Sequence, residues 1–424
     1  MAEKVLNSST AYVASQREEK TTSIQSLKKI ILGMQHLIAM FGATVLVPIL
    51  TGLDPSVSLV CAGIGTLLFH LCTKGIVPVF LGSSFAFIPV IITVREVYKG
   101  DLAYAQGGII VAGLIYIMFS MLVKIFGAEK IKRFFPAQVT GPMIVIIGLN
   151  LLPVAYGMAS GNFLISGVTL GVALTMTFFG KGFVKQLAIL TGVISGYVLA
   201  YSLGVLDVSV VTQAKWVSMP AFTLPKFDLG AIAIIAPVVL AVFMEHVGDI
   251  TTNGAVVGKN FFDNPGLHRT LLGDGIATLV AGFLGGPANT TYGENTGVLA
   301  LTKNYDPSIL RITAVFAIGL GCISKLGSVL QSIPVPVMGG ISVMLFSMIS
   351  LIGIKTVKNS GTQMDAKNIF LMATILIVGL GTIFLEKAGI SIGIPISENI
   401  KITGLSLAAI VGVVLNQVVN YKKA

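Results

Sequence analysis

This chain of 424 residues is 54% hydrophobic and only 11% charged, and its mean hydropathy is +0.90. Soluble domains carry about 25% charged residues, so the composition excludes a soluble globular protein and predicts that lipid surrounds most of the chain. The net charge of +10 does not indicate a nucleic-acid partner, because most basic residues fall in segments predicted to face the cytoplasm.

The charged residues divide the chain into apolar runs, most of which are about long enough to cross a bilayer. The runs without Asp, Glu, Lys or Arg are 30–53, 55–73, 75–94, 102–123, 134–180, 186–206, 229–244, 275–293, 312–324, 326–354, 368–385 and 402–421. The run 134–180 contains a turn at 156–162 and therefore predicts two spans. Together the runs predict an all-α integral membrane protein with about fourteen segments, some short or broken.

The longest polar connection, residues 207–229, lies near the middle of the chain on the predicted outer side. It separates two halves, 28–206 and 230–421, that each contain about seven predicted segments. An odd number of segments inverts the second half relative to the first, which is the design of inverted-repeat transporters. Residues 1–27 form a predicted cytoplasmic tail, and the basic residues predict that both termini face the cytoplasm from a multi-pass protein of the inner (plasma) membrane.

Each half contains one apolar segment that is too irregular for a continuous helix. The first, 77–89, begins and ends near Pro and contains the small polar pair Ser83 and Ser84. The second, 285–297, contains four Gly, one Pro and a run of polar residues, and each is the third segment of its half. Non-helical backbone at membrane depth is tolerated where it lines a cavity, so the two segments predict a binding site; two ordinary re-entrant loops are the alternative.

Carboxylates inside apolar segments are costly and indicate function. Glu245 and Asp249 are four residues apart and share one face of a predicted helix, whereas His246 points elsewhere. A helix that ends at the membrane surface with these charges in water is the alternative. Glu294 lies in the second broken segment, far from any basic residue, and therefore needs a proton, a cation or a ligand donor.

This chemistry suits a small polar ligand with N–H groups. The carboxylates would accept hydrogen bonds from its N–H groups, amides freed at the broken segments would donate to its carbonyl oxygens, and Phe85 and Tyr292 offer faces for a planar ring.

His36 and His70 are interpreted as core residues, and Asp274 as a charge at a helix end. The sequence contains no motif for a metal, a cofactor or a catalytic nucleophile, so an enzyme is not expected.

Residues 294–303 fit the ten-residue signature of the nucleobase-ascorbate transporter (nucleobase:cation symporter-2) family: an acidic or amide residue, Asn, any residue, Gly, four of any kind, Thr, then Lys, Arg or Gly. The stretches 35–48, 81–87, 245–248, 265–269 and 334–340 resemble the bacterial uracil permeases of that family. The resemblance implies fourteen segments in two inverted repeats. A core domain would contain segments 1–4 and 8–11, and a gate domain segments 5–7 and 12–14.

The resemblance also implies residue roles in a proton-coupled uracil importer that works by alternating access. Glu245 and Glu294 would bind the N–H groups of uracil, and the backbone amides of Phe85 and Gly293 its oxygens. The implied binding residues are completed by Tyr292 and Ala43, which would wall the ring, and by Ser84. Supporting roles are implied for His246, Asn295 and Phe346, and no metal or cofactor is expected.

Two positions depart from the uracil permease pattern. Asp249 stands where that pattern has His, and Phe346 stands where it has Tyr. Asp249 is one helical turn from Glu245, so the two carboxylates can share one proton, and Glu245, Asp249 and Glu294 are the proton-coupling candidates.

Glu294 favours uracil over xanthine or urate, because carriers of those purines usually have Gln there. The alternatives are a xanthine or purine carrier, a sodium-coupled symporter, and, from a different class, an anion channel or exchanger of related fold, which the carboxylates disfavour. A homodimer through the gate domain is expected by analogy.

Overall fold

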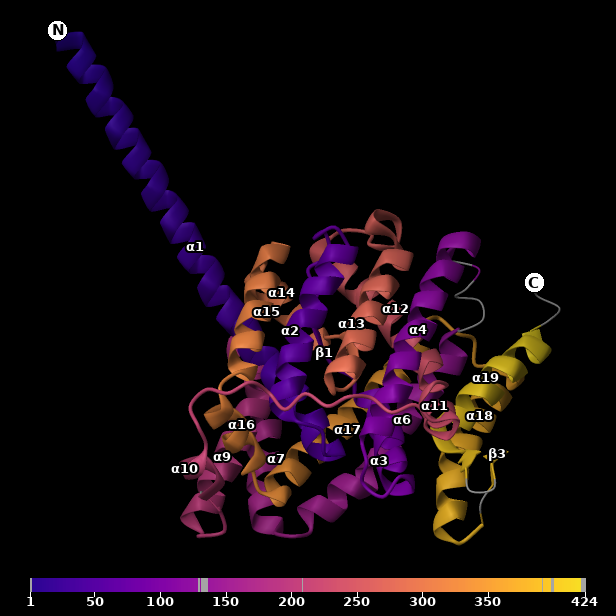
Figure 1. The fold of residues 1–424 in the computed structure, drawn as a ribbon. Coiled ribbons are helices and arrows are strands. Elements are labelled where there is room, and N and C mark those ends of the chain that lie inside the picture. Colours follow the sequence, from indigo (N-terminus) through magenta and orange to yellow (C-terminus); the bar gives the residue numbers. More distant parts are fainter. Residues whose placement is uncertain are drawn as a thin grey trace.

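The computed structural model describes residues 2–128, 130, 136–207, 209–390, 392–397 and 400–420, so residue 421, the predicted end of the second half, lies outside it. The fold is a bundle of helices with two small two-stranded sheets (Figure 1). The helices are α1 (Ala2–Thr51), α2 (Pro55–Cys72), α3 (Ile88–Val97), α4 (Ala103–Phe126), α6 (Ala137–Ala159), α7 (Phe163–Phe179), α8 (Phe183–Gln186), α9 (Ala188–Ser202), α10 (Ser209–Gln213), α11 (Leu229–Ile235), α12 (Val238–Val257), α13 (Leu267–Leu284), α14 (Gly293–Thr302), α15 (Pro307–Gly321), α16 (Ser324–Gln331), α17 (Val335–Asn359), α18 (Ala366–Lys387) and α19 (Gly404–Asn420), with single turns η1 (Phe85–Phe87) and η2 (Phe262–Gly266).

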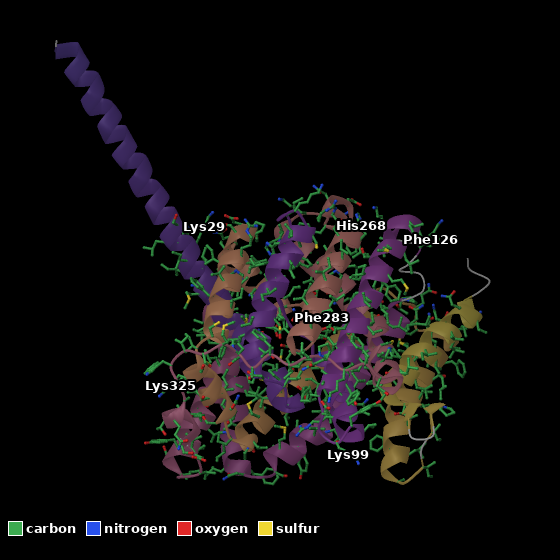
Figure 2. The ribbon with its side chains drawn as sticks, viewed as in Figure 1. Lys29, Lys99, Phe126, His268, Phe283 and Lys325 are labelled. Carbon is green, nitrogen blue, oxygen red and sulfur yellow. The ribbon has the colours of Figure 1, made fainter. Side chains whose placement is uncertain are left out.

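Several of these helices can span a membrane. Within the described ranges, six spans are long and apolar enough, one of which combines α11 and α12, and a seventh results if the bent pair α15 and α16 is counted as one. Large apolar side chains remain exposed on the bundle, such as Phe126 at 52% and Phe283 at 49% (Figure 2). Such a surface is stable in lipid rather than in water, which confirms a mostly helical, multi-pass membrane protein.

Several helices begin at polar residues that lie between the apolar stretches, because these residues cap the helices that follow. The Asp54 carboxylate accepts hydrogen bonds from the backbone N–H of Ser56 at 2.6 Å and of Val57 at 3.3 Å at the start of α2. The equivalent caps of α7, α11 and α15 are Asn162, Asp228 and Asp306. The turn predicted at 156–162 is shorter, because α6 continues through Ala159.

The first helix differs from the prediction of a tail that ends at residue 27. Helix α1 is continuous from Ala2 to Thr51, and only its part from Ser26 to Thr51 qualifies as a membrane span. The N-terminal part projects away from the bundle (Figure 1). The predicted start of the first segment at residue 28 therefore lies within two residues of the start of this span.

The connection between the two halves crosses the bundle as an extended strap, residues 214–228 (Figure 1). At one end, Ser218 N–H donates to the carbonyl of Cys322 at 3.2 Å. At the other, Lys226 donates from its backbone to Ala103 at 2.9 Å and from Nζ to Asp101 at 2.7 Å. The hydrogen bond from Lys226 lowers the pKa of the Asp101 carboxyl. The strap is thus fixed to the bundle at both ends.

The two broken segments meet in the interior. Strand β1 (Leu81–Ser83) pairs antiparallel with β2 (Asn289–Thr291), with Gly82 opposite Thr290, and both strands are buried. Further bonds from Ser84 N–H to Ala288 at 2.9 Å and from Tyr292 N–H to Phe80 at 3.0 Å satisfy the flanking backbone. The prediction of two non-helical stretches is confirmed, although both are shorter than 77–89 and 285–297, because η1 begins at Phe85 and α14 at Gly293.

A second small sheet was not predicted. Strands β3 (Ile394–Ser397) and β4 (Ile400–Ile402) form an antiparallel hairpin between α18 and α19. It lies at the same end of the bundle as α3 (Figure 1), and none of its described residues lines the cavity beside β1 and β2.

Candidate functional site

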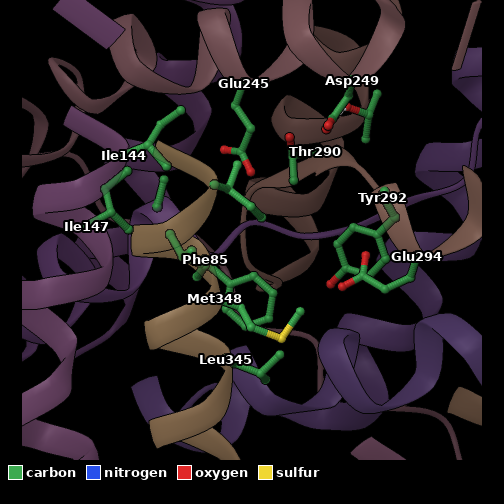
Figure 3. Close-up of a pocket in the computed structure, with 15 residues that line it drawn as sticks. Phe85, Ile144, Ile147, Glu245, Asp249, Thr290, Tyr292, Glu294, Leu345 and Met348 are labelled. Carbon is green, nitrogen blue, oxygen red and sulfur yellow. Dashed lines mark hydrogen bonds between the residues drawn. The ribbon is translucent and has the colours of Figure 1, made fainter. Parts of the chain in front are cut away.

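A cavity of about 320 Å³ lies beside the β1–β2 crossing (Figure 3). One side, which we call the polar wall, comes from α12, β2 and α14 and consists of Glu245, Asp249, Thr290, Thr291 and Glu294. The opposite side, the aliphatic wall, comes from α6 and α17 and consists of Ile144, Ile147, Leu345, Met348, Ile349 and Ile352. Phe85, Ala86, Tyr292 and Gly293 complete the lining.

The three predicted carboxylates line this one cavity. Glu245 and Asp249 project from the same face of α12, which continues to Val257, so the interpretation of a helix that ends at the membrane surface is wrong. Glu294 lies in the first turn of α14, where the helix dipole stabilises negative charge. The Thr291 hydroxyl donates to Asp249 Oδ2 at 2.7 Å, which ties one carboxylate directly to the broken segment.

The aromatic residues of both broken segments also reach the cavity. Tyr292 is 4% exposed, and its hydroxyl donates to the Ser83 carbonyl at 2.9 Å, so it links the two segments. Phe85 lies in η1 and lines the cavity from the other segment (Figure 3). Gly293 is exposed to open space, with no neighbouring atom within 4 Å of the position of a Cβ.

The other predicted residues lie behind the lining. Ala43 packs in one apolar cluster with Tyr292, and Phe346 is buried in the core beside the aliphatic wall. Ser84 is fully buried, and its Oγ has no hydrogen-bond partner within the described part of the chain. Asn295 Nδ2 contacts His36 Nδ1 at 3.1 Å and donates to the His36 carbonyl at 3.1 Å. His36 and His70 are both buried, which confirms that they are core residues.

His246 points away from the cavity into a buried cluster. Its Nδ1 lies 2.8 Å from Asp274 Oδ2, its Nε2 lies 2.9 Å from Thr270 Oγ1, and all three side chains are fully buried. The interpretation of Asp274 as a charge at a helix end is therefore wrong. Asp274 lies inside α13 and pairs with His246 of α12, a partner that its own neighbours in the sequence do not reveal.

We expect Asp274→Ala to lower the free energy of unfolding by about 3 kcal/mol, because it leaves the buried Nδ1 of His246 without its carboxylate partner. Thermal unfolding of the purified full chain measures the loss. The double variant Asp274→Ala/His246→Leu removes both polar groups and should lose less than the sum of the two single variants. Additive losses would contradict a direct coupling between the two side chains.

Gly82 permits the close packing of the two broken segments. A Cβ at this position would lie 2.3 Å from the Tyr292 ring, closer than atoms can approach. We expect Gly82→Ala to cost about 1–3 kcal/mol of stability, because the Tyr292 ring must move. The control is Gly319→Ala in α15, where a Cβ meets no atom within 4 Å and the substitution should be neutral or stabilising. Equal melting temperatures of the two variants would contradict this role of Gly82.

The sequence did not single out the aliphatic wall or the two threonines. Leu345, Met348, Ile349 and Ile352 follow the i, i+3, i+4, i+7 spacing of one helix face, as lipid-facing residues do, so nothing in the pattern marks them. Thr290 is buried and its Oγ1 has no hydrogen-bond partner among the described residues. In the same described part, no group of three or more His, Cys, Asp or Glu could hold a metal ion.

A multi-pass helical bundle in which two broken segments cross beside a cavity lined by carboxylates defines a membrane transporter rather than an enzyme. A family profile described as "Permease family" matches residues 27–388. The chain belongs to this family, the nucleobase-ascorbate transporters, which confirms the resemblance found in its signature.

The sequences of individual relatives support the same family assignment. The chain is 42% identical over 402 residues to a protein of Haemophilus influenzae described as "Probable uracil permease", with 92% of this chain and 94% of that protein covered. It is 38% identical over 403 residues to the "Uracil permease" of Escherichia coli, with 92% and 91% covered. To the "Uracil permease" of Bacillus subtilis it is 37% identical over 410 residues, with 92% of each covered.

Two solved structures share the fold at low sequence identity. The transmembrane domain of the cyanobacterial bicarbonate transporter BicA matches with a TM-score of 0.61 at 16% identity, covering 83% of this chain and 94% of that chain. The structure of SLC26A9 matches with a TM-score of 0.67 at 10% identity, covering 94% and 65%. These similarities establish the fold and do not identify a ligand.

Proposed function

We propose that this protein imports uracil together with a proton by alternating access. The observation that supports this most is the presence of Glu245 and Glu294 in one cavity. Uracil is a neutral planar ring whose two N–H groups alternate with two carbonyl groups. Carboxylates are acceptors only, so two of them facing one ring select a ligand with two N–H donors. The relatives described as uracil permeases support the same substrate.

The roles of individual residues follow from this pairing. Glu245 and Glu294 accept the N–H hydrogens of uracil, and the backbone amides of Phe85 and Gly293 donate to its carbonyl oxygens. Phe85 and Tyr292 cover the ring. Ala43 and Ser84 support these residues from behind the lining, and Phe346 supports the aliphatic wall. His246 holds α12 in place through Asp274, and Asn295 holds α14 through His36.

Within this proposal the chain has fourteen segments in two inverted repeats, with the broken stretches in segments 3 and 10. The packing of the helices supports a two-fold relation. Helix α2 packs against α15 as α4 packs against α13, and α7 packs against α9 as α18 packs against α19. These are segments 2 with 11, 4 with 9, 6 with 7 and 13 with 14, which an inverted seven-segment repeat interchanges. Segments 1–4 and 8–11 form the core domain, and 5–7 and 12–14 the gate domain.

The basic residues support a location in the inner membrane with both termini in the cytoplasm. Lys29 and His268 lie toward one end of the bundle, and Lys99 lies at the opposite end (Figure 2). The sequence predicts that most basic residues lie in segments on the side of the first end, which is typical of the cytoplasmic side. By analogy with the family, the protein forms a homodimer through the gate domain in this proposal.

Proton coupling would supply the energy for accumulation. One positive charge that moves inward releases about 2.3 kcal/mol per 100 mV, which supports roughly fifty-fold accumulation of a neutral substrate. Asp249 is the group proposed to exchange the proton, because it lies one turn from Glu245 on the same face of α12, and the two carboxylates can share one proton. Inward release of uracil then frees both substrate and proton.

Uptake of labelled uracil by proteoliposomes tests the proposal. Accumulation should rise with an inward proton gradient and collapse when an uncoupler is added, and replacement of sodium by choline should leave it unchanged. Accumulation that persists with the uncoupler, or that requires sodium, would contradict proton coupling. A failure of uracil to bind at all would contradict the substrate itself. An anion substrate is disfavoured because three carboxylates face the cavity.

A further inference from the structure

The cavity has two chemically opposite sides. The polar wall presents Glu245, Asp249 and Glu294, whereas within the described residues α6 and α17 contribute only aliphatic side chains to the lining. Figure 3 shows the two groups across the space from each other, with Ile144 and Ile147 to one side of Glu245 and Met348 below Asp249 and Thr290 in this view. A ligand in this space therefore meets hydrogen-bonding groups along one edge and hydrocarbon along the other.

Uracil has the same division. Positions N1, C2, N3 and C4 carry all its donors and acceptors in one continuous arc, and positions C5 and C6 carry only hydrogen. When the polar arc binds the carboxylates and the backbone amides, the C5–C6 edge must face the aliphatic wall. This orientation pairs the polar groups of the ring with the carboxylates and the amides and buries the apolar edge against carbon.

The aliphatic wall has room for a substituent at C5. A cavity of about 320 Å³ falls at the lower end of the range for drug-sized ligands, whereas uracil has only eight non-hydrogen atoms. Ile147 and Leu345 are 4% and 7% exposed and form the closed part of the wall. Met348 is 40% exposed and unbranched, so it can move to accommodate a larger ligand.

We infer that the aliphatic wall contacts the C5–C6 edge of the nucleobase and restricts the substrates to pyrimidines whose C5 substituent is apolar. Met348 is the part of this wall that can adapt to the substituent. This inference rests on the proposed binding of uracil. A methyl group or a halogen at C5 gains contacts with carbon. A polar group at C5, or the ring nitrogens that a purine carries at this edge, loses its water and finds no partner on the wall.

Thymine and 5-aminouracil provide a matched test, because a methyl and an amino group at C5 have nearly the same size and differ in polarity. Competition against labelled uracil on the purified full chain measures both, with xanthine as a third competitor. We expect thymine to compete at least about tenfold better than 5-aminouracil and xanthine, which is the loss expected for one buried polar group without a partner. Equal competition by thymine and 5-aminouracil would overturn the inference.

Two variants of Met348 test its proposed role in the preference for an apolar substituent at C5. Met348→Gln has nearly the same size and adds a donor and an acceptor, so the preference for thymine over 5-aminouracil should shrink severalfold, whereas Met348→Leu should keep it. An unchanged ratio in Met348→Gln would overturn the role of Met348. The ligand series on the native protein decides the role of the wall even if a variant fails to fold. Absence of uracil binding by the native protein would instead contradict the proposed function.

Discussion

Replacement of Glu294 by Gln is expected to weaken uracil binding by about 10- to 100-fold. Glu294 lies in the first turn of α14, where the helix dipole stabilises negative charge, and its carboxylate faces the cavity, where it can accept a hydrogen bond from an N–H group. The amide of Gln retains one acceptor oxygen but replaces the other with a donor, which cannot pair with an N–H of the ligand. Hydrogen bonds to a charged partner contribute about 1.5–3 kcal/mol, and their loss corresponds to this range of affinity.

Equilibrium binding of labelled uracil to the purified protein measures this effect. The matched control is Glu96→Gln, the same chemical change at an exposed position near the end of α3. The control should bind uracil as the native protein does. Native affinity in Glu294→Gln would contradict the proposed contact between this carboxylate and the substrate.

Replacement of Asp249 by Asn is expected to abolish accumulation while uracil still binds. The amide has the shape of the carboxylate and can still accept the hydrogen bond from Thr291, but it cannot carry a proton. Accumulation driven by an inward-negative potential of 100 mV should fall from roughly fifty-fold to about one-fold. Exchange of labelled for unlabelled uracil across the membrane should continue, because exchange needs no net movement of protons.

The control for Asp249 is Asp365→Asn. Asp365 caps the start of α18 in water, and Asn caps helices equally well. Gradient-driven uptake should be unaffected in this variant. Uncoupler-sensitive accumulation by Asp249→Asn would place the proton on another group, with Glu245 as the next candidate because it shares the same face of α12.

Much of the fold could be predicted because charge is so rare in this chain. Residues such as Asp54 mark where the chain leaves the membrane, and the same side chains cap the helices that follow. The broken segments could be predicted because Pro and Gly cannot continue a helix without loss. Glu245 and Glu294 stood out because an isolated carboxylate in an apolar segment needs a specific partner.

The remainder depends on contacts between distant parts of the chain. Asp274 was placed at a helix end because its partner, His246, lies 28 residues away in another helix. The aliphatic wall could not be recognised because Leu345 and Met348 have the same chemistry whether they face lipid, core or ligand. Only the packing of α17 against α6 distinguishes these surroundings.

The comparison with anion transporters shows what the shared fold leaves open. BicA and SLC26A9 share the overall fold, so the fold is a scaffold that does not by itself identify the substrate. In this protein the side chains on that scaffold are three carboxylates opposite a hydrocarbon surface. The substitutions of Glu294, Asp249 and Met348 therefore change only side chains that line the cavity, and they leave the shared fold unchanged.

The pairing of β1 with β2 also bears on how the protein is made. Tyr292 and Ser83, which are hydrogen-bonded across the crossing, are 209 positions apart in the chain. While the ribosome is still synthesising the second half, the backbone of Leu81–Ser83 has no strand to pair with, and unpaired backbone within a bilayer is costly. The backbone N–H and C=O groups of Leu81–Ser83 therefore lack their strand partners until the second half inserts. The crossing of the two broken segments can therefore form only after Asn289–Thr291 have been synthesised, and a chain that stops before β2 contains no site.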